Sequence, residues 1–178
     1  MITRRKGVTL IELTIGIIIS ALLLCGIMNL LSAGMKGSTK GLAHQANMEA
    51  ASILMSQIEY DLLRATDILD PQNNEKDKSA RWKMFNARSS SGSGTVTYSV
   101  GADSVTRNVE MSDGSKENSV FCSGHKIELN FTKFAVETGF EQVRHGMFVE
   151  LKVSAKDKKT AVAESFEMKR LIMVRSQF

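Results

Sequence analysis

One acidic residue, Glu12, lies inside the most apolar stretch of this chain, and that combination constrains the fold more than any other feature. Residues 8 to 31 read VTLIELTIGIIISALLLCGIMNLL, which is about the 20 residues that a helix needs to cross a bilayer. The preceding Arg-Arg-Lys at residues 4 to 6 is expected to stay on the cytoplasmic side. The sequence therefore predicts one spanning helix over residues 8–31, with everything after Leu31 beyond the membrane.

A cleavable secretory signal is the alternative reading of this segment. The apolar stretch is long for a signal core, and the nearest small-residue pair that follows it, Ala33-Gly34, is a poor Ala-x-Ala site. An ionised carboxylate at the centre of a spanning helix costs about 2.5–3.5 kcal/mol and usually marks function. Both observations favour a helix that the mature protein retains.

The segment Arg5-Lys6-Gly7-Val8-Thr9-Leu10-Ile11-Glu12-Leu13 resembles the prepilin processing site of the type IV pilin and type II secretion pseudopilin superfamily. The resemblance implies that a membrane peptidase cuts after Gly7 and methylates the new amino terminus at Val8. The family's usual phenylalanine or methionine is replaced here by valine. Glu12 is then the fifth residue of the mature chain and the assembly residue.

The chemistry of Glu12 fits that role. An inserted subunit carries a buried positive amine at Val8, and the Glu12 carboxylate of a neighbouring subunit can neutralise it. Attraction between opposite charges grows as the effective dielectric falls, so the pair could set the register between packed helices, as a lone polar group does in a coiled coil. This is a hypothesis about assembly.

Two segments continue the predicted helix. Three glycines at 34, 37 and 41 each lower helix propensity by up to about 1 kcal/mol, so this segment is either a weak point in one long helix, which we favour, or a juxtamembrane loop. From residue 42 an apolar stripe recurs at helical spacing. Its members are Ala51, Leu54, Ile58, Leu62, Ala65 and Leu69. Polar residues between them, among them Gln57, Glu59 and Asp61, are expected on a solvated or filament-facing side, and Asp70-Pro71 is expected to end the helix.

The rest of the chain has the pattern of antiparallel strands. Residues 95–100 and 104–110 alternate polar and apolar around Gly101-Ala102-Asp103, which predicts a hairpin. Further strands are predicted at 81–86, 119–122, 126–136, 147–155 and 163–174. We expect an antiparallel meander that buries one face against the helix stripe.

The predicted fold is therefore α+β and pilin-like, a long helix packed on an antiparallel sheet. The expected parts are a basic leader at 1–7, a transmembrane helix at 8–31, an amphipathic continuation at 32–70 and a periplasmic head at 71–178. The order of Ile58–Ala65, Thr97–Val100, Val105–Arg107 and Met173–Arg175 also resembles the minor pilins that include the J-type pseudopilins. That resemblance implies an inner-membrane subunit whose partners are other pilins or pseudopilins, the prepilin peptidase and, as an open alternative, secreted cargo.

Other function classes have little support in the sequence. The net charge is +4, of which residues 4–6 supply three, so the remainder is nearly neutral and nucleic acid is not the expected partner. The three histidines lack metal-ligand spacing and no catalytic motif is present, so we expect no enzyme, no metal and no cofactor. Cys25 and Cys122 are expected to be unbridged. The acidic and amide run at Gln72–Lys78 is a weak candidate for calcium, because its carboxylates lack EF-hand spacing.

A membrane-anchored binding module is the second function class. In that reading the same helix displays the head to cargo, to DNA during uptake or to a surface. An exposed aromatic and basic patch would support it, and the candidates are Trp82 and Phe85 beside Arg81 and Lys83.

Overall fold

A computed structural model of the protein describes residues 9–72, 74–85, 92–138, 142–155 and 165–174. One helix, α1 (Leu10–Leu63), is followed by nine strands. The chain divides into two compact units, and the boundary falls between Leu42 and Ala43. The second half of α1 therefore belongs to the same unit as the strands, whereas the sequence placed the head at residues 71–178.

Helix α1 is continuous through Gly34, Gly37 and Gly41, so the prediction of a helix here is confirmed and the loop alternative is wrong. The helix ends at Leu63, seven residues before the expected Asp70. The residues after it form strand β1 (Ala65–Asp70), so the expected helical continuation to residue 70 needs correction.

The strands form two antiparallel sheets instead of the single meander that we expected. The first has the order β1-β3-β4-β5-β6 and the second β2-β7-β8-β9. The first sheet contains, besides β1, the strands β3 (Ser79–Phe85), β4 (Ser93–Val100), β5 (Val105–Met111) and β6 (Lys116–Phe121). The second sheet contains β2 (Lys76–Asp77), β7 (His125–Thr138), β8 (Gln142–Ala155) and β9 (Ser165–Met173). The predicted hairpin at 95–110 is confirmed, with Val100 opposite Val105.

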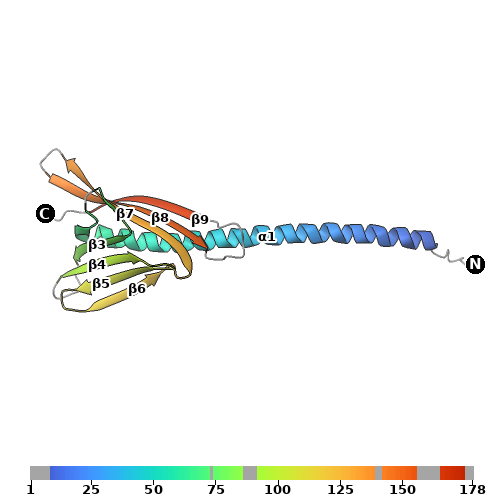
Figure 1. Ribbon diagram of the computed structural model, residues 1–178, viewed down its shortest axis with the longest axis horizontal. Helices are drawn as coiled ribbons and strands as arrows, with labels where there is room; N and C mark the ends of the chain where they lie inside the picture. The colour runs from blue at the N-terminus through green and yellow to red at the C-terminus, as the bar shows by residue number, and fades with distance from the viewer. Residues whose placement is uncertain (1–8, 73, 86–91, 139–141, 156–164, 175–178) are drawn as a thin grey trace, which may run out of the picture. The chain divides into compact units, whose positions relative to one another are not determined.

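Both sheets pack on the second half of α1. In Figure 1, β9 and most of β8 lie on one side of this part of the helix and β4, β5 and β6 lie on the other, while β7 crosses the helix from the side of β6 to that of β9. The helix contributes a buried stripe to one continuous core, formed by Ala51, Leu54, Met55, Ile58 and Leu62. Burying each large side chain in such a core contributes roughly 1.5–3 kcal/mol.

An aromatic cluster joins the two sheets. The ring of Trp82 in β3 stacks on Tyr98 in β4 with centroids 5.2 Å apart, and it meets Phe131 of β7 edge-on at 6.4 Å. All three side chains are fully buried. Because strand side chains alternate between faces, Trp82 faces the core while Arg81 and Lys83 face solvent.

Candidate functional site: an acidic residue on the apolar helix and a buried ion cluster

The first turn of α1 is closed by a reciprocal pair of side chains. The Glu12 carboxylate accepts hydrogen bonds from the Thr9 backbone N–H at 3.2 Å and from the Thr9 hydroxyl at 3.1 Å. In return, the Glu12 N–H donates to the Thr9 hydroxyl oxygen at 3.3 Å. This is a capping box, in which a residue with a side-chain oxygen and a glutamate three positions later satisfy backbone N–H groups at a helix start.

The surface around Glu12 is apolar and exposed. Leu10, Ile11 and Leu13 are 85%, 68% and 59% exposed, and the large side chains from there to Leu31 are exposed as well. Among the described residues, α1 is the one helix long and apolar enough to cross a membrane, and none of its most apolar 18-residue window is buried. The prediction of a helix with these properties is confirmed.

Small residues continue the line of Glu12 along the helix. Gly16 and Ser20 follow it at intervals of four residues, the spacing that places side chains on one face. With Ala21 they form the floor of a shallow furrow whose sides are Leu13, Ile17 and Leu24. A Cβ added at Gly16 would meet nothing within 4 Å. Such stripes let two helices approach closely in a membrane.

The predicted processing residues, Gly7 and Val8, lie outside the described residues. Cleavage after Gly7 and methylation of Val8 therefore stay predictions, and so does the role of Glu12 in assembly.

A second polar cluster lies in the core of the second compact unit, residues 43–178, called the head unit below. It overturns the expectation that Asp61 faces solvent. The side chain of Asp61 is 1% exposed. Its carboxylate accepts from Nε and Nη2 of Arg107 at 2.6 Å and 3.0 Å, and from the Tyr98 hydroxyl at 2.7 Å. A buried carboxylate is stable only when it is paired and hydrogen-bonded, and these contacts supply both conditions.

The cluster extends from the core to the surface. Gln57 donates to Asp61 at 3.3 Å, and Nη1 of Arg107 donates to the exposed Glu117 at 3.3 Å. Burial, then the charge of Asp61, raises the pKa of Tyr98 above its ordinary value. Burial opposes the charged form of Arg107, but its bonds to Asp61 hold the Arg107 pKa above the ordinary value. The arrangement keeps Arg107 charged and Tyr98 neutral, so it fixes α1 against β4 and β5.

Sequence reasoning missed this cluster, although one signal was available. Asp61 lies three residues after Ile58 and seven after Leu54, so helical spacing places it on the buried stripe. Arg107 is 46 residues away, on the inward-facing side of β5. Nothing in the local sequence pairs the two residues.

The aromatic and basic surface patch is not present as predicted. Trp82 is fully buried, whereas Phe85 is 48% exposed. Arg81 pairs with Asp70 at 3.0 Å. The patch of the binding-module alternative therefore loses Trp82 but keeps Phe85, Arg81 and Lys83 at the surface.

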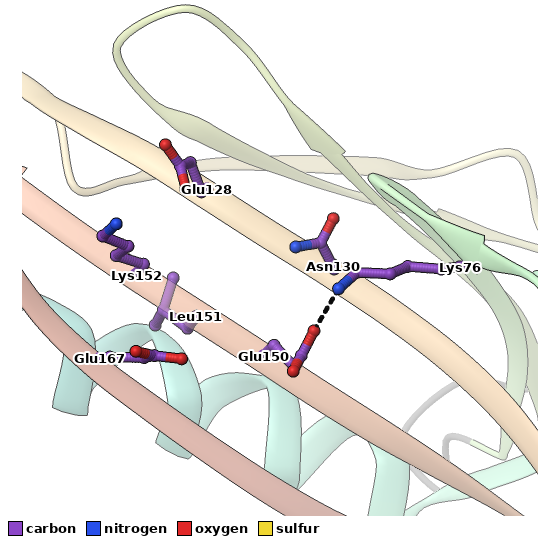
Figure 2. A pocket seen from close by; sticks show the side chains of 7 residues that line it. All are labelled: Lys76, Glu128, Asn130, Glu150, Leu151, Lys152 and Glu167. Atoms are coloured by element: carbon purple, nitrogen blue, oxygen red, sulfur yellow. Dashed lines mark hydrogen bonds and ion pairs between the residues drawn. The ribbon is translucent and has the colours of Figure 1, made fainter.

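A charged depression of about 270 Å³ lies on the outer face of the second sheet. Figure 2 shows Lys76 reaching Glu150, with Asn130 and Glu128 along β7 and Lys152 and Glu167 on the neighbouring strands. Lys169 also pairs with Glu150 at 3.3 Å and with Glu167 at 3.1 Å. The hydrogen bond from Lys76, followed by that from Lys169, lowers the pKa of Glu150. Lys76, Glu150, Lys169 and Glu167 therefore form a chain of ion pairs on the sheet surface, called the ionic ladder below.

The histidines are not gathered into a site. His44 lies beside the Phe166 ring, with centroids 6.0 Å apart, while His125 and His145 lie opposite Ala155 and Ala135 in the second sheet. In the described part of the chain, no three His, Cys, Asp or Glu side chains are grouped to hold a metal ion. In the Gln72–Lys78 segment, the Asp77 carboxylate accepts from the N–H groups of Lys78 and Ser79. Cys25 and Cys122 are both free.

Comparison with known proteins found no relative of this chain. No protein family, no curated protein and no solved structure matches the chain.

Proposed function

We propose that this chain is a minor pilin or pseudopilin, a structural subunit that assembles through its N-terminal helix into an envelope filament. In this proposal a prepilin peptidase removes residues 1–7 and methylates Val8. The observation that carries the proposal is Glu12, a carboxylate on an otherwise apolar and fully exposed helix surface. It is joined to the Gly7-Val8-Thr9-Leu10-Ile11-Glu12 sequence that resembles a prepilin site.

The energetics of Glu12 support an assembly role. An ionised carboxylate costs about 2.5–3.5 kcal/mol at the centre of a spanning helix on insertion scales and less near its end, where Glu12 lies in the first turn, so a partner that neutralises it would stabilise the inserted state. The amine of Val8 on a neighbouring subunit is such a partner. Gly16 and Ser20 continue the same face of the helix, and their small side chains would let a second helix approach Glu12 closely.

The proposed location follows from the charges that flank the helix. The basic residues at 4–6 would hold the N-terminus at the cytoplasmic face of the inner membrane, and the head would then lie in the periplasm. Within this proposal the head has a structural role and no catalytic one. Its buried helix–sheet cluster at Asp61 suits a domain that must keep its shape while packed among other subunits.

Sequencing the N-terminus of the mature protein tests the proposal. The expected first residue is Val8, carrying an added methyl group by mass spectrometry, and Gly7→Leu should leave residues 1–7 in place. The mature chain should also copurify with sheared or detergent-extracted filaments. A first residue near Gly34 would show a secretory signal and would reject the proposal.

A further inference from the structure

Strand β7 has a neighbour along the whole of one edge but along only a fraction of the other. All its residues, from His125 to Thr138, pair with β8. On the opposite edge the two-residue strand β2 pairs only with Phe131 and Thr132. Across the ranges that the structure describes, no strand pairs with that edge from His125 to Asn130. This part of the edge therefore has no strand neighbour, and the nearest fixed point of the other sheet is the turn residue Asp103, whose carbonyl accepts from the Gly124 N–H at 3.1 Å.

The backbone of this open edge is oriented for strand pairing. The Lys133 carbonyl accepts from the Asn74 N–H at 2.8 Å, so the backbone groups of Lys133 face the β2 edge. Backbone groups of alternate strand residues point to the same edge. The N–H and C=O groups of Ile127 and Leu129 are therefore directed to the open edge, although both side chains are buried in the core.

The open edge forms one wall of a groove of about 450 Å³. The opposite wall consists of Lys78 and of residues 100–102. Residue 100 ends β4, and residues 101 and 102 begin the turn to β5. That turn is held by the Gly101 N–H, which donates to the Ser104 carbonyl at 2.8 Å. Five residues of strand span about 17 Å, so the edge from 126 to 130 accepts a segment of about that length.

The charges at the groove are unbalanced. Two lysines, Lys78 and Lys126, line it with one glutamate, Glu128. Among the described residues neither lysine lies within ion-pair distance of a carboxylate, in contrast to Lys76 and Lys169 on the adjacent ionic ladder. A ligand with an acidic side chain would therefore gain attraction here.

We propose that this groove binds an extended polypeptide segment carrying an acidic side chain, which adds to the second sheet as a strand antiparallel to β7 and in line with β2. Main-chain hydrogen bonds to Ile127 and Leu129 would provide affinity, and Lys78 and Lys126 would select the acid, as in other cases of strand addition. The edges of β1 and β6 in the first sheet are less suited. Strand β1 pairs with irregular register, and β6 presents Lys116 and other polar, exposed side chains. The proposal goes beyond filament assembly and does not rest on it.

The binding test uses the full-length protein in detergent micelles and fluorescein-labelled peptides. The probe is Thr-Val-Asp-Val-Thr, and its two controls carry N-methyl groups on alternate residues or lysine in place of aspartate. By fluorescence anisotropy, both controls should bind at least tenfold more weakly. Hydrogen exchange at the Ile127 and Leu129 amides should slow on binding, while exchange at Val109 in the other sheet should not.

Variants of the groove complete the test. Lys78→Glu with Lys126→Glu should reverse the preference, so that the lysine peptide binds more tightly than the aspartate peptide. Lys83→Glu, an exposed change on β3, should leave binding unchanged. Ala102→Phe, at an exposed groove residue, should block every peptide.

Four results would overturn the proposal. They are equal binding of the N-methylated peptide, unchanged exchange at Ile127 and Leu129 when peptide is bound, no binding of any peptide at millimolar concentration, and self-association of the protein that Ala102→Phe abolishes. The last result would assign the groove to a second copy of this chain.

Discussion

The buried cluster at Asp61 gives the sharpest prediction about stability. Asp61→Ala removes the acceptor for Tyr98, Gln57 and two nitrogens of Arg107, and it leaves the 7%-exposed Arg107 in the core. Removing one partner of a buried ion pair costs about 3–5 kcal/mol. Because Glu117 remains 3.3 Å from Arg107 at the surface, we expect the lower end of that range, about 3 kcal/mol.

Urea unfolding of the full-length protein in micelles measures this loss directly. Trp82 is the single tryptophan of the chain, and it is buried and stacked on Tyr98, so its fluorescence reports the unfolding of the head unit. Glu59→Ala is the matched control, since it lies on the same helix and breaks only the exposed ion pair with Arg170. Such pairs contribute about 0–1 kcal/mol.

A combined variant tests the physical reason for the loss. If the cost comes from leaving Arg107 charged and unpaired, then replacing the whole cluster by apolar groups should recover most of the stability. Asp61→Leu, Tyr98→Phe and Arg107→Met together make that replacement. The reasoning fails if Asp61→Ala costs no more than Glu59→Ala, or if the triple variant is less stable than Asp61→Ala alone.

Two smaller predictions follow from the head unit. Burial raises the pKa of Cys122 to about 11, so in a Cys25→Ser background iodoacetamide should label Cys122 with a midpoint near pH 11; a midpoint near the ordinary value of about 8.5 would contradict this. Because the folded state keeps the thiol proton to higher pH than the unfolded chain, stability should fall as pH rises from about 9. Gly146→Ala should cost about 1–3 kcal/mol by overpacking, since its Cβ would lie 2.1 Å from the Phe134 ring; urea titration should show the cost vanish in a Phe134→Ala background.

The strands were predictable where alternation is regular and the partner is near in sequence. The hairpin of β4 and β5 has both properties, and its turn residues are Gly101, Ala102 and Asp103. The segment that follows α1, strand β1 (Ala65–Asp70), lacks regular alternation. Ala65 and Ile68 are both buried although they are three residues apart, because the pairing of β1 with β3 shifts register between Ala65 and Asp67. The sequence extends the helix to residue 70 because Leu69 follows Ala65 at helical spacing, whereas in β1 Ile68 is buried and Leu69 is half-buried.

The candidate site residues also differ in how far the sequence predicts them. Glu12 could be found from the sequence because a charged residue inside an apolar stretch is visible without knowledge of the fold. The pairing of Asp61 with Arg107, and the open edge of β7, depend on which strands become neighbours. The chain leaves the second sheet after β2, because Ser79 pairs with Ser99 in the first sheet. No local pattern encodes that departure, so the groove beside Ile127 and Leu129 could be found only from the structure.

Glu12 caps the helix, and in the proposed function it also offers a charge to a neighbouring subunit; the cap and the charge can be separated by substitution. Its bonds to Thr9 need only an acceptor oxygen, which glutamine also provides in a capping box, whereas pairing with the amine of Val8 needs the negative charge. Glu12→Gln therefore keeps the cap and loses the charge, and Thr9→Ala does the reverse at a cost of about 1 kcal/mol.

If assembly depends on charge, quantitative immunoblots of isolated filaments should show Glu12→Gln and Glu12→Ala reduced at least tenfold relative to total membrane protein. Thr9→Ala should then incorporate nearly as well as the parent chain. The opposite pattern, with Glu12→Gln incorporated normally and Thr9→Ala lost, would assign Glu12 to the helix start and reject the proposed pairing between subunits.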